Sequence, residues 1–200
     1  MLAMSLFVIV PIQAPFYFSQ RLAMRPSTIA LLVSALTGAS SLTSLGVAVW
    51  PRRSPVKTIL CVGFLLMAVG LSTLALWPQI TALALGMMAI GCGIGLIVPC
   101  INVWIAELVA PHHRGRAMGL LAAANSLGQF LTPIWSQGLL DLYGYEGLFL
   151  SAAIMALLLL LFISLNLSHA QLAEDRESTE MTVFSLEKSE KKATKTRRFK

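Results

Sequence analysis

Residues 148–167 read LFLSAAIMALLLLLFISLNL, a run of twenty residues without Asp, Glu, Lys, Arg or His. Thirteen of the twenty are Leu, Ile or Phe. At about −0.3 to −0.6 kcal/mol for each side chain, these thirteen favour insertion into a bilayer by roughly 4–8 kcal/mol. A helix needs roughly 20 apolar residues to cross the hydrocarbon core. This stretch therefore predicts a membrane-spanning helix.

Five further stretches of similar length also lack ionisable side chains. They cover residues 2–18, 28–50, 58–76, 81–105 and 117–140. Because the apolar runs are continuous and do not alternate, we expect helices and not the strands of a barrel. The expected fold is an all-α membrane protein, a bundle of six transmembrane helices within residues 1–167.

The first stretch, residues 2–18, is the shortest, and it contains Pro11 and Pro15. A signal peptide is the alternative for this stretch. The basic residues that begin a signal peptide are missing, and no small-x-small cleavage site stands where one is needed. We therefore expect residues 2–18 to form the first span.

Charged residues are scarce and unevenly distributed. They make up 12% of the chain, whereas a soluble domain has about 25%. Of the 24 charged residues (15 basic and 9 acidic), 14 lie in the last 30 positions. For the first 170 residues this excludes a soluble enzyme, a nucleic-acid-binding module and a disulfide scaffold. Residues 168–200 are mixed in charge and low in apolar content, so we expect a disordered tail.

Arg and Lys indicate how the bundle is oriented. Connections 51–57 and 106–116 contain five basic residues, whereas the other three connections together contain two. The positive-inside rule places these two connections and the basic tail in the cytoplasm. With six spans, the N-terminus is expected there as well. The expected location is the plasma membrane, specifically a bacterial inner membrane.

Residue types that carry chemistry are few. Cys61, Cys92 and Cys100 lie inside expected spans without CxxC spacing, and we interpret them as packing residues. His112 and His113 lie in a connection without a third ligand nearby, so we interpret them as solvated. No nucleophile, phosphate-loop or metal-hydrolase motif is present. We expect no enzyme activity, no cofactor, no metal site and no nucleic-acid partner.

Uncharged polar residues inside the spans carry the remaining information. Residues 125, 129, 132 and 136 are Asn, Gln, Thr and Ser, and their spacing places them on one helix face. Amides in hydrocarbon need partners, so this polar stripe faces either a neighbouring helix or a water-accessible solute pathway. Both explanations stay open. The candidate pathway residues come from the first and fifth spans: Gln13, Tyr17, Asn125, Gln129 and Thr132.

Glycine and proline indicate helix packing. Gly91 and Gly95 have the i, i+4 spacing that lets helix backbones approach closely, and Gly128 lies in the fifth span. Pro99 and Pro133 each remove a backbone donor and are expected to kink their helices.

Between residues 86 and 140 the chain resembles the tenth and eleventh helices of major facilitator superfamily transporters, particularly the drug–proton antiporter-like branch. The resemblance rests on GCGIGLIVP at 91–99, IAELVAP at 105–111, RGRAMG at 114–119 and LGQFLTP at 127–133. It implies that residues 1–167 form the C-terminal six-helix half, and that this half takes part in moving a small organic solute by alternating access. It also implies that the spans 58–76 and 148–167 stand outside the cavity. Their low polarity independently predicts that they face lipid.

The chain also departs from the family pattern. Residues 46–53 read GVAVWPRR, without the acidic residue of the family motif, and Thr132 replaces an expected glycine. The first six helices of the family are not in this sequence. The expected partners are therefore the bilayer, a solute, and either a missing N-terminal half or a second copy of the chain. The alternative is a non-transporting membrane protein, truncated or regulatory, that assembles with a partner.

A candidate cytoplasmic gate lies between the fourth and fifth spans. Glu107 ends the fourth span, and Arg114 and Arg116 precede the fifth. Glu107 could pair with Arg114 or with Arg116. The pair is either a latch that breaks when the bundle opens or an ordinary surface ion pair, which contributes about 0–1 kcal/mol.

Overall fold

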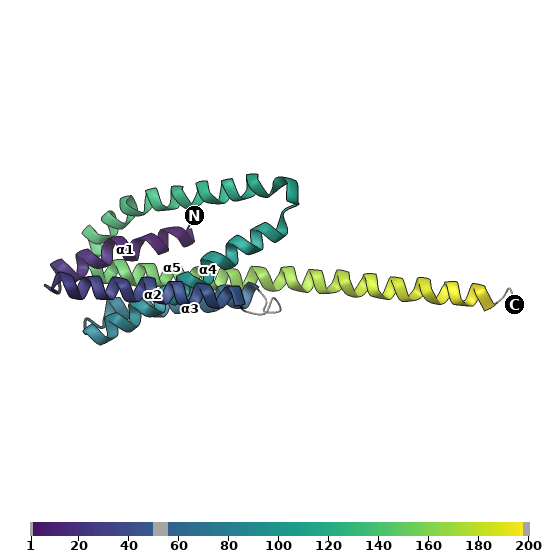
Figure 1. Cartoon of the computed structure of the whole chain (residues 1–200), viewed down its shortest axis with the longest axis horizontal. Helices are drawn as coiled ribbons and strands as arrows, with labels where there is room; N and C mark the ends of the chain where they lie inside the picture. Colours follow the sequence, from purple (N-terminus) through teal and green to yellow (C-terminus); the bar gives the residue numbers. More distant parts are fainter. Residues whose placement is uncertain (1, 50–55, 198–200) are drawn as a thin grey trace. The chain divides into compact units, whose positions relative to one another are not determined.

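The structure is a computed structural model that describes the backbone of residues 2–49 and 56–197 and the side chains of residues 6–47 and 56–165. All the secondary structure in these residues is helical (Figure 1). The helices are α1 (Leu2–Gln20), α2 (Pro26–Val49), α3 (Val56–Leu76), α4 (Ile80–Leu108) and α5 (Arg114–Arg197), with a short 3₁₀ helix (Pro111–His113) before α5.

Helix α5 consists of two helices joined at Gly144. This residue has φ 68° and ψ −173°, a conformation open essentially to glycine alone. The expected spans 117–140 and 148–167 lie on either side of this break. Each of the six expected spans therefore coincides with one helical stretch, apart from residue 50, which lies outside the described residues.

Four of the described helical stretches are long and apolar enough to cross a membrane. They are Pro26–Val47, Val56–Leu76, Ile80–Leu108 and Pro111–Leu165. The last has 55 residues, enough for two crossings, and contains the break at Gly144. A shorter apolar helix, Leu6–Gln20, belongs to α1. The expected all-α fold of membrane-length helices is confirmed, while a crossing by α1 stays a prediction.

Helix α4 packs against both α2 and α3. On the side of α2, Gly91 and Gly95 lie directly on the backbone: a Cβ added at either glycine would collide with the carbonyl oxygen of Leu36 or Ser40, respectively. Residue numbers rise together along the two helices, from Leu36 and Gly91 to Ser40 and Gly95, so α2 and α4 run parallel. Only residues without a side chain allow this approach.

On its other side, α4 meets α3 through pairs of opposed glycines. A Cβ on Gly70 would lie 2.6 Å from the carbonyl oxygen of Gly86, and one on Gly93 would lie 2.6 Å from that of Gly63. Residue numbers rise along α3 as they fall along α4, so these two helices run antiparallel. Helices α2, α3 and α4 therefore form a closely packed group in which α4 contacts both of the others.

The outer face of α3 is apolar. Val62, Leu65, Val69 and Leu76 are exposed there, at spacings that repeat along one side of the helix. In water such a stripe would be costly, whereas lipid tails cover it without penalty.

The chain divides into two compact units, Met1–Leu161 and Phe162–Lys200. In the second unit α5 continues to Arg197, over residues for which the sequence predicted a disordered tail. Residues 148–200 contain neither Gly nor Pro and are rich in Leu, Ala, Glu and Lys, so they contain no helix breaker.

Candidate functional site

Two of the expected pathway residues, Gln13 of α1 and Thr132 of α5, are buried. A hydrogen bond joins α1 to the first part of α5 there. The side-chain nitrogen of Gln13 donates a hydrogen bond to Ser136 Oγ at 3.1 Å, and both residues are buried. Ser136 Oγ donates to the Pro133 carbonyl at 3.3 Å. The buried Thr132 hydroxyl donates to the Gly128 carbonyl of its own helix at 2.7 Å. The polar groups of this contact therefore have partners within the protein.

The remainder of the polar stripe differs from this contact. Asn125 is half-buried and Gln129 is exposed, and neither side chain forms a hydrogen bond in the described part of the chain. The structure therefore brings Gln13 to Ser136 but leaves Asn125 and Gln129 free to meet water or a solute. Interhelical hydrogen bonding accounts for Ser136, whereas a pathway past Asn125 and Gln129 stays a prediction.

Tyr17 lies in an aromatic cluster beside the break in α5. Its ring centroid is 5.4 Å from that of Tyr145 and 5.5 Å from that of Phe149. The Tyr145 hydroxyl donates to Gln20 Oε1 at 2.9 Å. These contacts attach the end of α1 to the part of α5 that follows Gly144.

The gate residues are exposed and separate in this structure. Arg114 Nε donates to the Val109 carbonyl at 3.3 Å, which closes the turn between α4 and α5. Within residues 56–165, no ion pair joins Glu107 to Arg114 or Arg116. The latch therefore stays a prediction, and it would require a second conformation of this turn.

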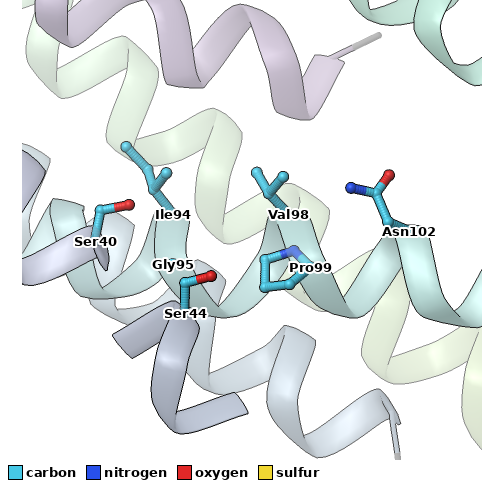
Figure 2. Close-up of a pocket in the computed structure, with 7 residues that line it drawn as sticks. All are labelled: Ser40, Ser44, Ile94, Gly95, Val98, Pro99 and Asn102. Carbon is cyan, nitrogen blue, oxygen red and sulfur yellow. The ribbon is translucent and has the colours of Figure 1, made fainter. Parts of the chain in front are cut away.

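A pocket of about 340 Å³ lies between α2 and α4 (Figure 2). Figure 2 shows the side chains of Ile94, Val98 and Asn102 on the same side of α4, one turn apart. Helix α2 contributes the hydroxyls of Ser40 and Ser44, which point toward α4. Gly95 and Pro99 complete the lining.

The expected pathway did not include the polar residues of this pocket. Ser40 and Ser44 have the i, i+4 spacing of one helix face, and Asn102 is the only amide side chain in its span. Both features are visible in the sequence, but only the packing of α2 on α4 shows that Ser40, Ser44 and Asn102 line the same pocket. Of the expected packing residues, Gly95 and Pro99 line the pocket, whereas Pro133 is exposed on α5.

Comparison with known proteins identifies the family. Residues 1–199 match the sequence profile of the Major Facilitator Superfamily. The chain belongs to this superfamily. Membership confirms the superfamily that the sequence motifs indicated, and it makes the chain a multi-pass membrane protein of a transporter family and not of an enzyme family.

Two individual proteins match parts of the chain. An uncharacterized MFS-type transporter of Salmonella typhimurium is 32% identical over 109 residues, which are 54% of this chain and 28% of the relative. Monosaccharide-sensing protein 2 of Arabidopsis thaliana is 36% identical over 111 residues, which are 54% of this chain and 15% of the relative.

The fold also matches a solved structure. A crystal structure of the peptide transporter POT in complex with alafosfalin superposes with a TM-score of 0.65 and 20% sequence identity. The superposition covers 82% of this chain and 34% of the POT chain. The superfamily member described here therefore spans only a minor part of the length of the proteins it matches.

Proposed function

We propose that this superfamily member forms the C-terminal six-helix half of a transporter that moves a small organic solute by alternating access. The observation that carries the proposal is the profile match along residues 1–199. The likeness of most of this chain to about a third of the POT chain supports a part of a transporter and not a whole one. In such transporters two bundles rock about a site near the membrane midplane. The second bundle would be an N-terminal half or a second copy of this chain.

The solute pathway in this proposal passes the polar face of α5. Asn125 and Gln129 lie on that face with unpaired amides, which can exchange hydrogen bonds between water and a solute. Gln13, Tyr17 and Thr132 border the pathway from positions that their contacts hold in place. The drug–proton antiporter-like motifs favour an organic solute, and this chain supplies no acidic residue in the middle of a span to bind a proton.

The test measures solute flux in membrane vesicles prepared from cells that express the chain. Vesicles from cells that do not express the chain give the background flux. The solutes are labelled glucose, labelled alanylalanine and the dye ethidium. For whichever solute moves, the double substitution Asn125→Ala with Gln129→Ala should lower flux about tenfold while the protein level stays unchanged, since two hydrogen bonds to the solute are lost.

The matched control is Ser72→Ala in α3, where the hydroxyl donates to the Ala68 carbonyl of its own helix. This variant should transport as the parent chain does. Unchanged flux in the double variant would remove Asn125 and Gln129 from the pathway.

A second candidate is a non-transporting, ligand-sensing membrane protein. The name of the Arabidopsis thaliana relative, a monosaccharide-sensing protein, favours it. Sensing requires ligand binding without flux, so the vesicle experiment separates the two functions.

A further inference from the structure

Between residues 37 and 44, the hydroxyl groups of α2 fall into two sets. Thr37, Ser41 and Thr43 each donate a hydrogen bond to a carbonyl three or four residues earlier in the same helix, at 2.7–3.2 Å. This is the usual way in which a hydroxyl is satisfied inside a membrane helix. Ser40 and Ser44, the two serines of the α2–α4 pocket, form no such bond in the described part of the chain. These two hydroxyls are therefore unpaired in the structure.

The two pocket serines lie where α4 packs closely against α2. The carbonyls four residues earlier belong to Leu36 for Ser40 and to Ser40 for Ser44. These are the same two carbonyls on which Gly91 and Gly95 of α4 lie. The backbone of α4 therefore lies against the carbonyls four residues before each serine. The same close contact places the two serines at the pocket.

The other polar group of the pocket is the amide of Asn102. It is half-buried and makes no hydrogen bond within residues 56–165. An amide and two hydroxyls can both donate and accept hydrogen bonds. The rest of the lining is apolar: Ile94 and Val98 lie on the same side of α4 as Asn102, and Gly95 and the ring of Pro99 complete it (Figure 2).

The lining of this pocket contains no ionisable side chain. A charged group bound there would lose its hydration without gaining a counter-charge, which is costly inside a membrane. At about 340 Å³, the pocket is in the size range of small-molecule sites. Its chemistry suits an uncharged ligand with an apolar body and one hydrogen-bonding group.

We propose that the α2–α4 pocket binds the uncharged, hydrogen-bonding part of the solute, with Ser44 and Asn102 as its polar contacts and Ile94 and Val98 as its apolar wall. The statement that the ligand is the transported solute rests on the proposed function. The statement that the pocket binds an uncharged ligand does not. A lipid acyl chain in the same pocket would use the apolar wall only. Its binding would not depend on Ser44 or Asn102.

Dansylamide and dansyl sulfonate test the proposal, because they share one aromatic body and differ in charge. The chain is placed in phosphatidylcholine nanodiscs, and the dansyl fluorescence is measured against empty nanodiscs. Dansylamide should bind saturably, and dansyl sulfonate should bind at least tenfold more weakly. The double substitution Ser44→Ala with Asn102→Ala should raise the Kd of dansylamide about tenfold.

Ser41→Ala is the matched control, because it removes a hydroxyl of α2 that is bonded within its own helix. Its Kd for dansylamide should equal that of the parent chain. Val98→Trp places a large side chain in the pocket and should abolish binding. Size-exclusion chromatography of each variant identifies any that fails to fold, and the remaining variants then decide the outcome.

Three outcomes would contradict the proposal. No saturable binding to the parent chain, equal affinity for both dyes, or an unchanged Kd in the double variant would overturn it. In the last case the retained binding would indicate an apolar occupant such as a lipid chain. Specific binding of dansylamide without any flux in vesicles would instead contradict transport by this chain without an N-terminal half, and it would leave the pocket proposal intact.

Discussion

At the scale of single residues, the buried pair of Gln13 and Ser136 illustrates how a membrane protein satisfies an amide. The two residues are 123 positions apart, and their hydrogen bond joins α1 to α5 at 3.1 Å. The periodicity of the polar stripe predicted that Ser136 faces something other than lipid. It did not predict the partner, because spacing along one helix fixes a face and carries no information about the opposing helix.

Substitution of Ser136 tests this contact. Ser136→Ala leaves the buried Gln13 amide with one partner fewer, and we expect a loss of about 1–3 kcal/mol in stability. Adding Gln13→Leu removes the stranded amide, and the double variant should regain most of that loss. Thermal unfolding in detergent, followed by size-exclusion chromatography, measures both effects. Strictly additive losses would show that the two side chains do not interact.

At the scale of helices, the ends of the first four expected spans agree with the structure to within a few residues, whereas α5 runs from Arg114 to Arg197 across the expected spans 117–140 and 148–167. Helices α3 and α4 begin at Val56 and Ile80, where the sequence predicted 58 and 81. Ionisable groups cannot lie in hydrocarbon without cost, so their positions predict where an apolar stretch stops. The helices extend slightly further because a helix continues through the polar interface, where composition no longer restricts it.

The break in α5 depends on one residue. Gly144 has no neighbouring atom within 4 Å of an added Cβ, so its substitution tests backbone conformation alone. We expect Gly144→Ala to destabilise the protein by about 1–3 kcal/mol, since φ 68° with ψ −173° excludes a Cβ. Gly138→Ala is the control, because Gly138 also has open space and lies within the regular helix. It should be neutral or stabilising, since alanine favours helix by about 1 kcal/mol.

Thermal unfolding of the two glycine variants in the same detergent makes the comparison. Equal unfolding temperatures for Gly144→Ala and Gly138→Ala would mean that the break does not need glycine. The two parts of α5 would then be held apart by other contacts, such as that of Tyr145 with Gln20.

At the scale of the whole molecule, sequence motifs predicted the protein family, which the distribution of charged residues alone could not do. Motifs around Gly91 and Arg114 predicted the superfamily, which the profile match confirms. The α2–α4 pocket could not be predicted in the same way. It exists because glycines of α4 set the distance to α2, and such a distance follows from three-dimensional packing. The helical continuation to Arg197 was also not predicted, because composition alone does not distinguish a solvated helix from a disordered tail.

Five basic residues predict how the bundle is oriented in the membrane. Connections 51–57 and 106–116 contain all five, so both should be cytoplasmic in a bacterial host. Alkaline phosphatase, which is active only outside the cytoplasm, should be active when fused after Gln79 or Gly144 and inactive after Lys57 or Arg114. A green fluorescent protein fused at the same four positions should give the opposite pattern. Phosphatase activity after Lys57 or Arg114 would reverse the orientation, and the turn between Glu107 and Arg114 could then not act as a cytoplasmic gate.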